Sequence, residues 1–161
     1  MDKQQLLLKM VISSWDTQNS RMNKLLDVLS DEQLLLETAP DRNRGIYLLG
    51  HLTAVSDGMS TFLAWGERLY PQLDEVFIKN PDKSGLEMPA PAMVREYWNK
   101  VNANVSQHIS QMPSDEWFSK HTAVSEEDFA KEPFRNKLNI IINRTNHISY
   151  HFGQLVYLVK K

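Results

Sequence analysis

Four long segments of this chain place an apolar residue at every third or fourth position, the period of an α-helix that buries one face. The segments cover residues 3–29, 43–65, 91–112 and 134–159. No segment shows the strict alternation of apolar and polar residues that is typical of a half-buried strand. Four amphipathic helices of similar length pack most simply as a four-helix bundle, so we predict one all-α domain over residues 1–161.

Proline, glycine and polar residues mark the connections between these segments. Ser30 and Gln33 have the spacing of a capping box and predict a short helical turn. Residues 71–91 are rich in proline and contain Gly85, which predicts a long connection of the kind that joins parallel helices in a bundle. Residues 119–133 are polar and acidic, and we expect a loop over one end of the bundle.

Composition excludes several classes of function. The chain has no cysteine, which rules out disulfides, cysteine-ligated zinc and a cysteine nucleophile. It has 18 basic and 20 acidic residues without a basic cluster, so we expect no nucleic-acid partner. No apolar run approaches the roughly 20 residues that cross a bilayer, and the first residues do not resemble a signal peptide. We therefore expect a soluble, cytoplasmic protein without a membrane partner.

Three histidines form the strongest functional pattern. His147 and His151 lie four residues apart, which places both on one helix face, as in helices that give two ligands to one metal ion. His51 lies one turn from Leu48 and one turn from Val55, so it points inward. Three imidazoles from two helices would form a mononuclear site with open coordination positions. In the alternative structural interpretation, each histidine is a core side chain bonded to a carbonyl.

Three polar residues share the face of His147 and His151: Asn143, Arg144 and Gln154. We predict that Asn143 and Gln154 hydrogen-bond to the imidazoles or line the mouth of a pocket. Arg144 is a candidate for binding a substrate carboxylate. An ion pair between Arg144 and an acidic residue of the bundle is the favoured alternative.

The remaining ionisable residues receive a structural interpretation. His108 and His121 have no second ligand in helical register, although a loop folded over the site would bring His121 close. Asp57 lies on another side of its helix from His51, and Glu67 and Asp74 are expected to be solvated. No carboxylate stands out as a general base, which argues against a hydrolase.

The motifs Gly50-His51-Leu52 and His147-x-x-x-His151-x-Gly153-Gln154-Leu155, with the long connection between the second and third helices and an early Trp15, resemble the DinB/YfiT-like superfamily of bacterial four-helix bundles. The resemblance covers nearly the whole chain. It implies an up-down-down-up topology with the long connection between the second and third helices. It also implies a homodimer and a divalent metal at residues 51, 147 and 151, with zinc favoured and nickel or manganese as alternatives.

Some members of this superfamily are similar to thiol-dependent enzymes, including transferases that use bacillithiol and isomerases that use mycothiol. The resemblance therefore implies a metal-dependent enzyme that acts on a small-molecule substrate, with S-transfer from a low-molecular-weight thiol as the leading reaction. Such a metal would lower the pKa of a bound water or thiol, or polarise a carbonyl. Two alternatives stay open: a metal-binding bundle without catalysis, acting as a sensor or structural dimer, and a bundle without metal.

Overall fold

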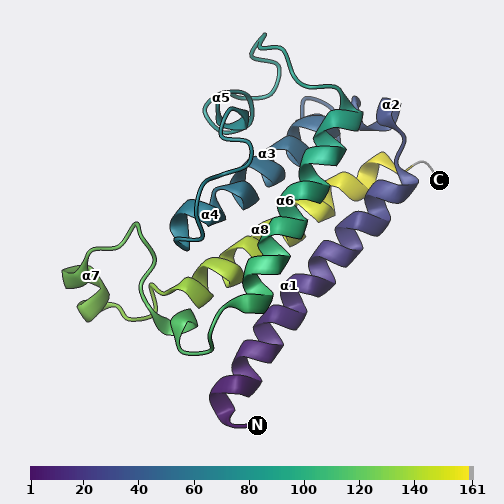
Figure 1. Cartoon of the computed structure of the whole chain (residues 1–161). Helices are drawn as coiled ribbons and strands as arrows, with labels where there is room; N and C mark the ends of the chain where they lie inside the picture. Colours follow the sequence, from purple (N-terminus) through teal and green to yellow (C-terminus); the bar gives the residue numbers. More distant parts are fainter. Residues whose placement is uncertain (160–161) are drawn as a thin grey trace.

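A computed structural model of the chain describes residues 1–159, which fold into a helical bundle without a β-strand (Figure 1). Its long helices are α1 (Lys3–Val28), α3 (Gly45–Asp57), α6 (Pro91–Gln111) and α8 (Lys137–Leu155). In Figure 1, α1 and α8 rise towards the upper right, whereas α3 and α6 run in the opposite direction. Helix α1 packs against α8, and α3 packs against both α6 and α8. The predicted all-α bundle is confirmed.

Side-chain caps fix where several helices begin. Asp2 and Gln5 form a capping box at the start of α1, and Ser30 and Gln33 form the predicted one at the start of α2 (Asp31–Leu34). Helix α8 begins three residues later than predicted, because the Asn136 side chain accepts a hydrogen bond from the backbone of the third helical residue. A 3₁₀ turn, η2 (Val156–Leu158), follows α8.

The second predicted helix ends earlier than its apolar pattern suggests. Helix α3 is followed, after Gly58, by the single turn α4 (Met59–Phe62). Ala64 then adopts a left-handed conformation with φ of 58°, and the Trp65 N–H bonds to the Ser60 carbonyl at 2.8 Å. This closure satisfies a carbonyl of the last turn and stops the helix before Trp65.

The long connection between α3 and α6 contains a short helix, α5 (Leu73–Phe77), which the sequence did not predict. Two side chains hold this connection in place: that of Arg44, the N-cap of α3, and that of Tyr47 on α3. The Arg44 guanidinium contacts the Asp82 carboxylate at 2.6 Å, and the Tyr47 hydroxyl donates to the Asn80 carbonyl at 2.8 Å. The connection therefore packs along α3 instead of extending into solvent.

The predicted polar loop 119–133 also contains a helix, α7 (Glu126–Lys131), and none of its residues is buried. Thr122 ties the preceding segment to α4, because its N–H and hydroxyl donate to the carbonyls of Phe62 and Thr61. Figure 1 shows α7 standing away from the bundle near the start of α8. The expectation of a loop without helix is wrong for this stretch.

The core is built around Trp15, Trp98 and Trp117, which are all buried. Near the N-terminus of α1, Leu8 is 6% exposed but the neighbouring Leu7 is 45% exposed. The first turns of α1 extend beyond the other helices in Figure 1, so fewer neighbours cover them. Some apolar residues of the four amphipathic segments are exposed and lie outside the core: Leu7, Met10, Met93, Ile142, Val156 and Val159.

Among residues 1–159, no helix combines the length and apolar character that crossing a bilayer requires.

Candidate metal centre

The bundle brings His51 of α3 together with His147 and His151 of α8. The Nε2 atom of His147 lies 3.2 Å from that of His51 and 2.9 Å from that of His151. One ring nitrogen from each residue lies within 4.8 Å of the other two. His151 is buried, and His51 and His147 are half-buried. Three imidazole edges therefore meet at one point between the two helices.

Hydrogen bonds on the far side of two rings decide where their lone pairs point. The Nδ1–H of His51 donates to the Phe77 carbonyl at 2.7 Å, and the Nδ1–H of His151 donates to the Gln154 side-chain oxygen at 2.6 Å. Because both acceptors are oxygens, each Nδ1 carries the proton and each Nε2 presents a lone pair. Two lone pairs thus face the Nε2 of His147, which is unfavourable unless a cation or proton lies between them.

This donor set fits a divalent metal ion. Two imidazole nitrogens about 2.0 Å from a tetrahedral zinc ion lie about 3.3 Å apart, close to the separations found here. A hydrogen bond from the outer ring nitrogen to a carbonyl or amide oxygen is also typical of metal-bound histidine. Among the described residues, no further histidine, aspartate or glutamate joins the cluster. Three ligands leave room for water or substrate on the ion.

Close packing places the carbonyl that orients His51. Gly50 precedes His51 on α3, and the ring of Phe77 lies directly over it. A Cβ atom at residue 50 would come within 2.3 Å of that ring, so only glycine permits this approach. Phe77 is fully buried and ends α5, which brings its carbonyl to the imidazole.

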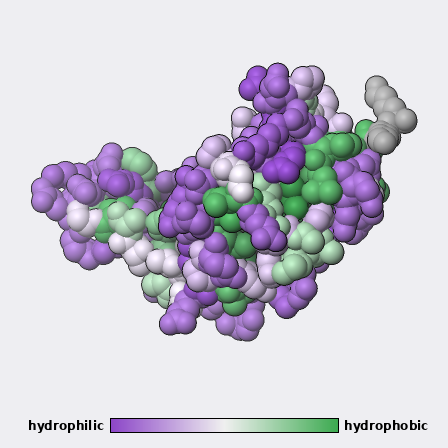
Figure 2. Space-filling view, turned by 90° about the horizontal axis from the view of Figure 1, so that it is seen from above, coloured by the Kyte–Doolittle hydropathy of each residue, from purple (hydrophilic) through white to green (hydrophobic). Residues whose placement is uncertain are grey.

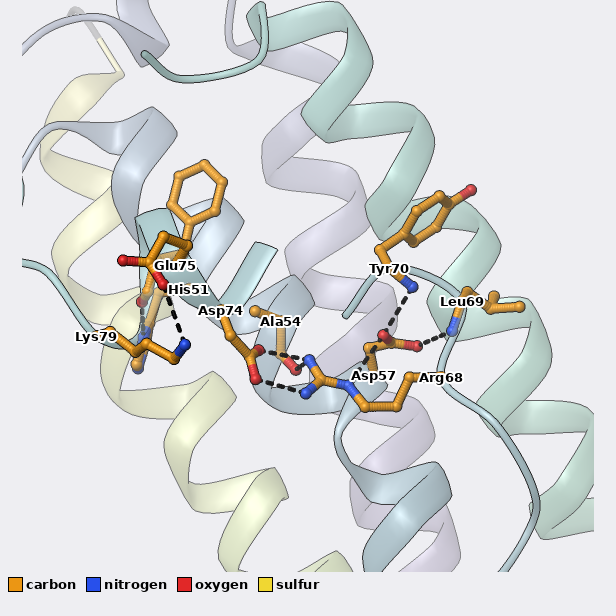
Figure 3. A network of polar contacts seen from close by, with 10 residues as sticks. His51, Ala54, Asp57, Arg68, Leu69, Tyr70, Asp74, Glu75 and Lys79 are labelled. Carbon is orange, nitrogen blue, oxygen red and sulfur yellow. Dashed lines mark hydrogen bonds and ion pairs between the residues drawn. The ribbon is translucent and has the colours of Figure 1, made fainter. Parts of the chain in front are cut away.

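An ion-pair network holds α5 in this position (Figure 3). Arg68 bonds to both oxygens of Asp74 in α5, at 2.5 and 2.6 Å, and reaches Asp57 of α3 at 3.3 Å. Asp57 is 1% exposed and also accepts the backbone N–H groups of Leu69 and Tyr70. The guanidinium holds the pKa of Asp74 below its usual value. Asp74 is therefore paired, contrary to the expected solvated state.

His147 and His151 are predominantly neutral at physiological pH. Burial, the neighbouring rings of His151 and His51, and the charge of Arg144 lower the pKa of His147 to about 4. Burial is also the main cause that lowers the pKa of His151. Neutral imidazole is the form that binds metal ions.

The polar residues predicted around the site differ in whether they contact the imidazoles. Gln154 contacts His151, as described, but Asn143 is exposed and bonds to none of the three imidazoles. Arg144 is half-buried, its Nε is buried without a partner, and the predicted ion pair is wrong: no carboxylate of the described residues pairs with it. Burial lowers its pKa.

His108 and His121 lie outside the cluster. His108 stacks on Trp65 with ring centroids 5.0 Å apart, and His121 contacts the edge of Phe62. The segment that carries His121 lies over α4 and does not bring its imidazole into ligand distance of the other three.

Two features of the site were missed from the sequence. Tyr47 stacks against His51, with ring planes 10° apart and centroids 6.3 Å apart, and its position one turn before His51 was the available signal. The Phe77 carbonyl gave no signal, because any residue offers a carbonyl.

A groove between α1 and α6 lies away from the histidine cluster. It encloses about 710 Å³ and is lined partly by Lys9, Asp16 and Ser110. None of the three clustered histidines lines it. We therefore base the functional assignment on the histidine geometry and not on groove size.

Comparison with known proteins agrees with the helical fold. No curated protein matches the chain. A crystal structure of a conserved protein from Enterococcus faecalis has a similar fold, with a TM-score of 0.65 and 16% identity over 98% of this chain and 95% of the other. At that identity the likeness concerns the fold alone. The sequence profile of the DinB superfamily matches residues 14–155. The chain belongs to the DinB superfamily.

Proposed function

We propose that this protein is a metal-dependent enzyme whose divalent ion is held by His51, His147 and His151, with zinc favoured over nickel and manganese. The observation that carries the proposal is the meeting of three Nε2 atoms, two of them with lone pairs fixed inward by Phe77 and Gln154. The absence of a fourth ligand among the described residues supports catalysis over a structural role, because structural zinc sites normally have four protein ligands.

S-transfer from a small thiol is the reaction that we favour. A bound divalent ion would supply a Lewis-acid centre at which a thiol ionises near neutral pH. The chain has no cysteine, so the sulfur comes from a cosubstrate. In this reaction the Phe77 carbonyl and Gln154 orient the rings of His51 and His151. The half-buried position of His51 and His147 gives a small molecule access from the surface.

Metal analysis of the purified protein tests the site. We expect one equivalent of divalent metal in the wild type and loss of metal in His51→Ala, His147→Ala and His151→Ala. His108→Ala is the matched control, because this ring stacks on Trp65 away from the cluster. Full metal content in all three variants would overturn the proposed site.

Thiol consumption in the presence of an electrophilic acceptor tests the chemistry. We expect metal-dependent consumption that His147→Ala abolishes and His108→Ala keeps. A metal-loaded protein that accepts no thiol or water on the ion would instead fit the alternative of a metal-binding bundle without catalysis.

The homodimer implied by the family resemblance remains a prediction. Sedimentation equilibrium is expected to give twice the 18.7 kDa chain mass, and a mass equal to one chain would contradict it.

A further inference from the structure

Arg144 differs from the other half-buried arginines of the molecule. Arg44 pairs with Asp82, Arg68 pairs with Asp57 and Asp74, and Arg95 pairs with Asp31. Each of these pairs supplies the carboxylate that a partly buried guanidinium requires. Arg144 has none among the described residues, and its buried Nε makes no hydrogen bond.

Neither of the two ligand helices offers Arg144 a free carboxylate. Residues 133–161, which include all of α8, contain no aspartate or glutamate. Burial lowers the pKa of Arg144. On α3, Asp57 is the single acidic residue, and Arg68 and two backbone N–H groups already engage it.

Arg144 lies beside the histidine cluster. It precedes His147 by three residues, which places both on one face of α8 about 4.5 Å apart along the axis. A divalent ion held by the three imidazoles next to this guanidinium would give three positive charges, with no free carboxylate on α3 or α8 to balance them.

We propose that Arg144 binds a carboxylate of the substrate or thiol cosubstrate, whose sulfur or oxygen binds at the histidine cluster. The inference rests on the proposed metal site and adds the substrate class: a small carboxylic acid with a metal-binding atom a few bonds away. A planar guanidinium matches a carboxylate through two parallel hydrogen bonds, and its buried Nε would gain a partner.

The experiment compares two thiols on the Co²⁺-loaded protein. We titrate 3-mercaptopropionate and 3-mercapto-1-propanol, which differ in the carboxylate, and follow sulfur-to-cobalt absorption. The wild type is expected to bind 3-mercaptopropionate at least about tenfold more tightly, since a hydrogen bond to a charged group has this magnitude. Arg144→Met is expected to lose that preference while it keeps Co²⁺ and its affinity for 3-mercapto-1-propanol.

Arg135→Met is the matched control, because Arg135 lies just before α8 and pairs with Glu132 at 3.2 Å. This variant is expected to keep the preference. If Arg144→Met keeps it as well, the carboxylate binds elsewhere, for instance on the metal, and the proposal is overturned.

A second measurement separates this proposal from the metal site itself. On the metal-free protein, succinate is expected to raise the unfolding temperature of the wild type but not of Arg144→Met. Arg144→Met without ligand should unfold at the same temperature or higher, because it removes an unpaired charge from a half-buried position. Failure to bind Co²⁺ would count against the metal site. Failure of succinate to distinguish the two proteins would count against Arg144.

Discussion

At the scale of single residues, the protonation state of His147 is the property that the fold changes most clearly. Three imidazoles share a partly buried space, and a proton on one of them meets the other two and Arg144. The folded protein therefore disfavours the charged form. A neutral ring is available to a metal ion without first losing a proton.

The stability of the metal-free protein should depend on pH through His147. Its pKa is about 4 in the folded protein and near 6.5 in the unfolded chain, so the unfolded chain binds more protons between these values. The contribution of His147 to the free energy of unfolding is fully present above pH 6.5 and is lost as the pH falls towards 4. For this half-buried group, the loss is less than about 1.4 kcal/mol per pH unit. Thermal unfolding of the wild type, His147→Gln and His108→Gln measures the effect. The His147→Gln curve should be flatter, and parallel curves for all three proteins would contradict the prediction.

At the scale of secondary-structure elements, α5 is the piece that completes the site from outside the two ligand helices. Phe77 at its end orients His51, Gly50 allows the contact, and Arg68 ties the element to α3 (Figure 3). The position of a metal ligand thus depends on a connection that contributes no ligand.

Two glycine substitutions test the contact between α3 and α5. Gly50→Ala should destabilise the protein by about 1–3 kcal/mol, because its Cβ overlaps the Phe77 ring, and it should weaken metal binding. Gly153→Ala is the matched control: no atom lies within 4 Å of its added Cβ, so higher helix propensity should stabilise α8 by up to about 1 kcal/mol. Chemical denaturation and Co²⁺ titration give both quantities. Equal effects of the two substitutions would show that the contact is unimportant.

Removing the ion pair tests the attachment of α5 separately. Arg68→Met leaves the buried Asp57 without its guanidinium and should cost about 3 kcal/mol. Lys79→Met is the control, since its pair with Glu75 is exposed on both sides and should contribute less than about 1 kcal/mol. Urea denaturation distinguishes the two variants. Similar losses of stability in the two variants would mean that burial does not strengthen the ion-pair network of Arg68.

At the scale of the whole molecule, the long helices of the bundle and the short helix α7 differ in how many buried side chains they contribute. Helices α3 and α8 contribute many buried side chains, whereas α7 contributes none and stands apart in Figure 1. Viewed from above, most of the surface is hydrophilic, with an apolar area beside the C-terminal end (Figure 2). The Gln33 side chain donates to the Leu158 carbonyl and joins α2 to η2.

Hydrogen exchange should reveal this difference. Backbone amides of α7 are expected to exchange orders of magnitude faster than those in the middle of α8, because α7 opens without exposing a core. Mass-spectrometric exchange of the metal-free and metal-loaded protein provides the measurement. Metal should slow exchange further in α3 and α8 and leave α7 unchanged. Comparable protection in α7 and α8 would be incompatible with the described packing.

The sequence by itself determined the helical segments and the inward position of the three histidines, because both follow from periods of three to four residues within one segment. The capping boxes are equally local, as Ser30 and Gln33 show. Tertiary structure decided the end of α4, the presence of α5, the acceptor for His51 and the unpaired state of Arg144. These depend on groups far apart in the chain, such as a carbonyl 26 residues from His51, whose approach only the packed bundle fixes.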